Sequence, residues 1–66
     1  TAAATCRTGL GDVAGILRSE ENVSAEVRSA VEADLATARS AEAREDWSGC
    51  LDALESALAR LDRTDG

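Results

Sequence analysis

The stretch DWSGCLDALESALARLD, residues 46–62, carries the most regular apolar pattern in the chain. Its apolar side chains recur every three or four positions, which is the spacing of one face of an α-helix. They are Trp47, Cys50 or Leu51, Leu54, Ala57 or Leu58, and Leu61. Asp46 is suited to cap the first turn, because its carboxylate can accept a hydrogen bond from a free backbone N–H. The pattern predicts a helix over residues 47–62.

A second helix is predicted over residues 25–44, where apolar residues again recur at helical spacing. The residues on this face are Val27, Val31, Leu35, Ala38 and Ala41 or Glu42. The polar run before this segment breaks the periodicity and offers Asn22 or Ser24 as an N-cap. The face narrows to small side chains toward its C-terminal end, which favours close packing against a neighbouring helix.

A third segment, residues 5–19, has one apolar face made of Cys6, Leu10, Val13 and Ile16 or Leu17. Three glycines interrupt it, and each lowers helix stability by about 0.5–1 kcal/mol relative to alanine. Two of them, Gly11 and Gly15, are four residues apart, and we expect them to mark a close approach of another helix. No segment alternates in the manner of a strand.

The predicted fold is therefore all-α, a three-helix up-down-up bundle in one small domain that spans residues 1–66. Its core must be thin, because 14 of the apolar residues are alanine and only thirteen are large. With so little apolar area to bury, the free energy of folding lies near zero once the entropy of ordering the chain is counted. We expect a covalent staple or a partner to supply the difference.

Cys6 and Cys50 are the only cysteines. In an up-down-up bundle the first and third helices run parallel, so both cysteines lie at the same end, and we predict that they form a disulfide. Two buried free thiols are the alternative. Closing this loop would stabilise the fold by roughly 4 kcal/mol in the loop-entropy model. Because disulfides persist in oxidising compartments, the pair also predicts a periplasmic or secreted protein. The alanine-rich composition, with arginine as the only basic residue, suggests a bacterial source.

Composition excludes several classes of function. The chain has no histidine and no lysine, so the usual proton-transfer and nucleophilic groups are missing and we expect no enzymatic activity and no cofactor. The net charge of −6 repels nucleic acid and anionic lipid headgroups. No run approaches the roughly 20 apolar residues of a membrane span, so membrane insertion is not expected.

The hairpin of the second and third helices has Ala38 in its first helix, Asp46 and Trp47 at its turn, and a small residue at Cys50 followed by Leu54 and Ala57. On these residues, Val31 to Asp62 resembles a single tetratricopeptide-type hairpin, a family in which glycine stands where this chain has Glu45. The resemblance implies a helical hairpin, and none of the residues with which that family binds peptides can be carried over onto matching positions. The whole chain resembles small exported bacterial helical proteins of unassigned function.

Together these features predict a non-enzymatic module for protein–protein interaction or scaffolding, with a protein partner or a homodimer. The candidate partner-binding residues are Trp47, Leu51, Leu58 and Leu61. Trp47, the sole aromatic, either covers the end of the core beside the disulfide or anchors a partner.

The alternative is a bundle that binds a small ligand or calcium. Carboxylates cluster at Glu20 and Glu21, and again at Glu42, Glu45 and Asp46. Neither cluster has the loop pattern of a tight calcium site, and we interpret both as solvated caps and helix faces, with no metal ligand assigned.

Overall fold

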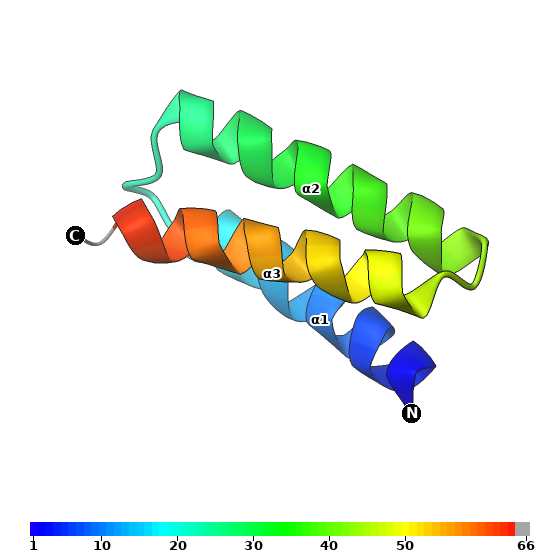
Figure 1. Cartoon of the computed structure of the whole chain (residues 1–66). Coiled ribbons are helices and arrows are strands. Elements are labelled where there is room, and N and C mark those ends of the chain that lie inside the picture. The colour runs from blue at the N-terminus through cyan, green and yellow to red at the C-terminus, as the bar shows by residue number, and fades with distance from the viewer. Residues whose placement is uncertain (65–66) are drawn as a thin grey trace.

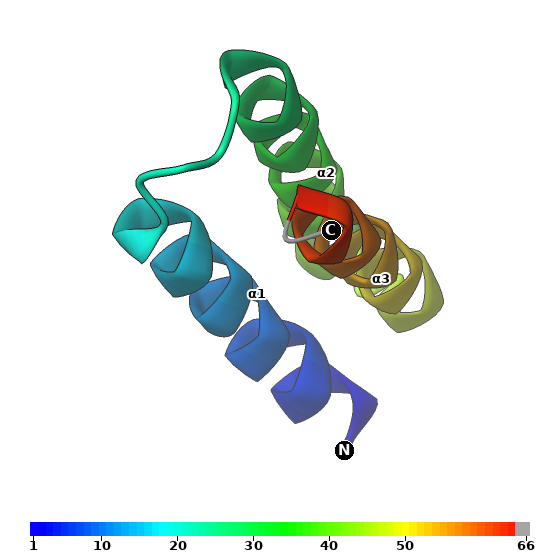
Figure 2. The same ribbon diagram turned by 90° about the vertical axis from the view of Figure 1, so that its left-hand side faces the viewer.

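The computed structural model describes residues 1–64, which form three helices and no strand. The helices are α1 (Ala2–Ser19), α2 (Ala25–Ala43) and α3 (Trp47–Thr64). Figure 1 shows α1 and α3 running in one direction and α2 in the other. The end view in Figure 2 places the three helices at the corners of a triangle. The all-α, up-down-up bundle expected from the apolar pattern is confirmed.

The ends of the helices differ slightly from the predicted limits of 5–19, 25–44 and 47–62. The first helix begins three residues earlier, at Ala2, because Thr1 caps it by accepting a hydrogen bond from the N–H of Ala4 at 3.1 Å. Only alanine and threonine precede Cys6, so no large apolar side chain marks this extra turn. The second helix ends one residue earlier and the third runs two residues further.

Side-chain caps begin the other two helices. The Ser24 hydroxyl accepts a hydrogen bond from the N–H of Val27 at 3.2 Å, so Ser24 rather than Asn22 is the N-cap of α2. The Asp46 carboxylate accepts one from the N–H of Gly49 at 3.1 Å, which confirms the cap predicted for α3. Each cap satisfies a donor that the first turn of a helix would leave open.

The turn between α2 and α3 is a Schellman-type helix ending. The N–H of Asp46 donates to the carbonyl of Ala41 at 2.8 Å, and the N–H of Glu45 donates to the carbonyl of Glu42 at 3.0 Å. This geometry needs a left-handed backbone at Glu45, whose φ is 60°. Glycine usually occupies such a position because a Cβ is unfavourable there, so Glu45 holds the tight turn at a cost.

The core is formed mainly between α2 and α3, which make the most extensive contact of the three helix pairs. Small side chains let two helix backbones approach closely. All four buried alanines lie on these two helices: Ala38, Ala41, Ala53 and Ala57. The first helix contributes three buried side chains, Cys6, Val13 and Leu17. Its attachment is therefore the least extensive in the bundle.

The close approach expected at Gly11 and Gly15 is wrong. A Cβ built on either glycine would have no atom within 4 Å, because both lie on the exposed face of α1. The close contact is at Gly9 instead, where a Cβ would come within 2.7 Å of the Leu54 Cδ1 atom. The four-residue spacing put the two glycines on one helical face but did not say which way that face points.

One long side chain ties the end of α1 to α2. The guanidinium of Arg28 donates to the carbonyl of Leu17 at 3.1 Å and to the carbonyl of Glu20 at 3.0 Å. Both carbonyls lie at or just beyond the last turn of α1, where they have lost their intrahelical donors. Arg28 thus joins α1 to α2 near the C-terminus of α1, while the disulfide joins α1 to α3 near its N-terminus.

Candidate functional site

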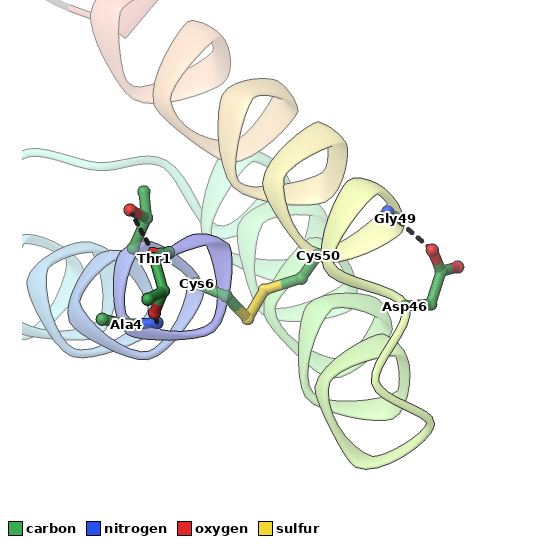
Figure 3. The surroundings of a disulfide bond; sticks show 7 residues. Thr1, Ala4, Cys6, Asp46, Gly49 and Cys50 are labelled. Atoms are coloured by element: carbon green, nitrogen blue, oxygen red, sulfur yellow. Dashed lines mark hydrogen bonds between the residues drawn. A yellow bond between two sulfur atoms is a disulfide. The ribbon is translucent and has the colours of Figure 1, made fainter.

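The disulfide joins the N-terminal parts of the two parallel helices. Cys6 lies in the second turn of α1 and Cys50 in the first turn of α3, and Figure 3 shows their sulfur atoms bonded across the gap between these helices. Their Cα atoms are 5.9 Å apart, within the usual range for a disulfide. The predicted pairing is confirmed. Both residues are completely buried, so the bond is part of the core and is inaccessible to external thiols in the folded state.

Trp47 lies at the start of α3, three residues before Cys50. It is partly buried and packs against the core, and the guanidinium of Arg7 sits 5.7 Å from the centre of its ring. A cation at this distance from an indole face contributes about 0.5–1 kcal/mol at an exposed site. One part of the side chain covers the core, as the first of its two predicted roles requires, and the other part remains open to solvent. Its role as an anchor for a partner stays a prediction.

The other candidate partner-binding residues divide between surface and core. Leu58 is 46% exposed, Leu51 is partly buried, and Leu61 is buried in the core with only 8% exposure. Leu61 therefore adds nothing to an exposed surface. Trp47, Leu51 and Leu58 follow one another at intervals of four and seven residues, so they share one side of the helix. We refer to these three residues as the α3 edge.

One exposed apolar residue was not singled out by the sequence reasoning. Ile16 in α1 is 38% exposed, while its neighbour Leu17 is buried. The apolar pattern allowed either residue on the core face, and packing selects Leu17. The choice could not be made without the direction from which α2 and α3 meet α1.

Two carboxylates have defined partners, one as a helix cap and one in an ion pair. Asp46 caps α3, and Asp34 accepts a hydrogen bond from the Nε of Arg60 at 2.9 Å. Within the described part of the chain, no group of three or more Cys, Asp or Glu side chains is placed to hold a metal ion.

A surface groove of about 260 Å³ lies between α1 and α2. Three arginines, one carboxylate and three apolar side chains line it: Ala14, Leu17, Arg18, Arg28, Glu32, Leu35 and Arg39. We refer to it as the α1–α2 groove. Sequence reasoning missed it because the three arginines are ten and eleven residues apart in the chain and meet only through antiparallel packing. The one available signal was that Arg28 and Arg39 lie three turns apart on the same side of α2.

No helix in the described part of the chain combines the length and the apolar character needed to cross a membrane. Comparison with known proteins found no family model, no curated protein and no solved structure that matches this chain.

Proposed function

We propose that this chain is a non-enzymatic module for protein–protein interaction or scaffolding, and that the α3 edge is its binding surface. The observation that carries the proposal is Leu58, which is 46% exposed on the helix whose apolar and polar sides are most sharply separated. A single exposed leucine is ordinary on a protein surface. Here it shares one helix side with Leu51 and with Trp47, a residue type enriched at binding hot spots.

The geometry of the bundle supports this choice of surface. Leu54 and Leu61 on the same helix are buried at 5% and 8% exposure, so the neighbouring helices already occupy that part of the apolar face. Leu58 lies at the margin of the covered region. A partner helix packed beside α3 would bury it and extend the core outward.

The disulfide supports an exported, periplasmic or secreted location, because reducing compartments do not maintain such bonds. The net charge of −6 makes a protein partner or a second copy a better candidate than nucleic acid or an anionic lipid surface.

The proposal is tested with Leu58→Asp, which places a charge on the α3 edge, and with Ala59→Asp as a matched control. Ala59 is exposed on the same helix, so the two variants have the same net charge. We expect Leu58→Asp to weaken self-association, or binding to a partner purified from the source cell envelope, by at least about tenfold. Ala59→Asp should leave it unchanged, and circular dichroism should show equal helicity in both.

Sedimentation and pull-down measurements decide the outcome. If the wild-type chain is a monomer, retains no partner and instead binds calcium or a small molecule saturably, the alternative function as a ligand-binding bundle replaces this one. If both variants weaken association equally, the effect is one of net charge and the α3 edge is not the surface.

A further inference from the structure

We propose that the α1–α2 groove binds a small molecule that carries an oxyanion next to a short apolar portion. The oxyanion is either a carboxylate or a phosphate. The groove lies between α1 and α2 and involves no residue of α3. The inference is therefore independent of the α3 edge, and either proposal can fail without the other.

Positive charge is concentrated in this groove. Three of the seven arginines in the chain line this one groove, together with a single carboxylate, that of Glu32. Among the described residues, none of these three guanidinium groups is ion-paired with a carboxylate, although acidic side chains outnumber arginines by thirteen to seven. An acidic protein thus keeps a cluster of unpaired positive charge at one place, which attracts an anion.

Hydrogen bonds to the backbone hold Arg28 in place at the groove. Two of its N–H groups donate to the carbonyls of Leu17 and Glu20, which hold the partly buried guanidinium at the wall of the groove. A guanidinium has five N–H donors, so others remain for a ligand. A donor that is already fixed loses little conformational entropy on binding, and its planar fork suits an oxyanion.

The groove also offers apolar surface beside its charged groups. Three apolar side chains line it between the charged residues: Ala14, Leu17 and Leu35. Its volume of about 260 Å³ lies just below the roughly 300 Å³ at which small-molecule sites usually begin. The groove therefore suits a ligand with one or two anionic groups and a few apolar atoms.

Nuclear magnetic resonance titration of the disulfide-bonded protein tests the proposal. The probes are phenyl phosphate and benzoate, with inorganic phosphate to measure the contribution of the apolar part and sodium chloride to keep the ionic strength constant. We expect saturable shifts of the amides of Leu17 and Leu35, and no comparable shifts at Leu58. The stronger of the two aromatic probes tells whether the groove prefers phosphate or carboxylate.

Charge variants identify the groups that bind. Arg18→Gln with Arg39→Gln should weaken the probe about tenfold, because each exposed ion pair changes affinity severalfold. Arg44→Gln with Arg63→Gln changes the net charge equally at exposed positions outside the groove and should have little effect. Glu32→Gln removes the only carboxylate of the groove and should tighten binding about twofold or more.

Three results would overturn the proposal. They are the absence of saturable groove shifts at about 10 mM of either aromatic probe, equal weakening by the two double variants, and shifts centred on α3. Leu58→Asp serves as a further control, because it should not alter probe binding. Circular dichroism of each variant checks that the bundle remains folded.

Discussion

The α2–α3 hairpin and α1 are held in the bundle by different interactions. The hairpin joins two neighbouring helices through a tight turn, and its interface is the most extensive in the bundle. The first helix buries only three side chains and carries Gly11 and Gly15 on its exposed face, where they lower helix stability without permitting any close contact. The comparison teaches that a helix with few buried side chains can be held in a bundle by bonds at both of its ends. Here these are the disulfide to α3 and the hydrogen bonds from Arg28 of α2.

Removing the disulfide has the largest expected effect. Cys6→Ser with Cys50→Ser should lower the free energy of unfolding by about 4 kcal/mol, because the unfolded chain regains the entropy of an open loop of 44 residues. For a domain of this size that corresponds to a melting temperature lower by about 20 °C. Thermal unfolding followed by circular dichroism measures it, with Ala59→Ser as a control. A loss of only a few degrees would mean that packing alone holds α1.

Core truncations in the two regions sharpen the comparison. Val13 in α1 and Val31 in α2 are both almost completely buried. Replacing either with alanine should cost about 2 kcal/mol in the disulfide-bonded protein, from lost burial and the cavity left behind. In the Cys6→Ser, Cys50→Ser background, the effect of Val13→Ala should shrink because α1 is then largely detached, whereas Val31→Ala should keep its effect. Urea unfolding of the two parent proteins and their four valine variants gives both differences, and equal effects in both backgrounds would break the comparison.

Replacing the exposed glycines of α1 should have a smaller effect on stability, and one of opposite sign. Gly11→Ala and Gly15→Ala should each stabilise the protein by about 0.5–1 kcal/mol, because both positions are helical and open to solvent. Gly9→Ala should give no such gain, since its Cβ would press on the buried Leu54 side chain. Chemical unfolding measures all three, and a gain at Gly9 equal to the others would show that the contact with Leu54 is loose.

The smallest expected effect lies in the hairpin turn. Glu45→Gly should stabilise the protein by about 0.5 kcal/mol, because glycine adopts the left-handed backbone without the steric cost of a Cβ. Glu45→Ala removes the same charge but keeps the Cβ, and it should give no gain. If the alanine variant is stabilised as much as the glycine variant, charge repulsion rather than backbone strain is the cost at this turn.

The helix pattern and the disulfide could be predicted because each rests on local or topological rules. The start of α3 followed from Asp46 and the apolar stripe after it, and the pairing of Cys6 with Cys50 followed from two parallel helices. The start of α1 did not follow, because Ala2 belongs to no apolar stripe although it is a good helix former. The direction of Gly11 and Gly15 also depends on packing, which spacing does not encode.

The candidate surfaces were harder to predict for the same reason. Leu58 and Leu61 belong to one apolar stripe, and only the angle at which the other helices meet α3 leaves the first exposed and buries the second. The α1–α2 groove is lined by three arginines, which come from two different antiparallel helices. Neither result can be read from a single helical face.

Hydrogen exchange of the backbone amides tests the central claim most directly, that α1 is the weakly packed helix and is fastened at its ends. In the disulfide-bonded protein, the amides around Val13 should open at a lower free energy than those of Val31 and Leu54, and reduction should widen the difference. Measurement by nuclear magnetic resonance at low denaturant resolves each helix. Equal opening free energies for the three helices, before and after reduction, would contradict the account.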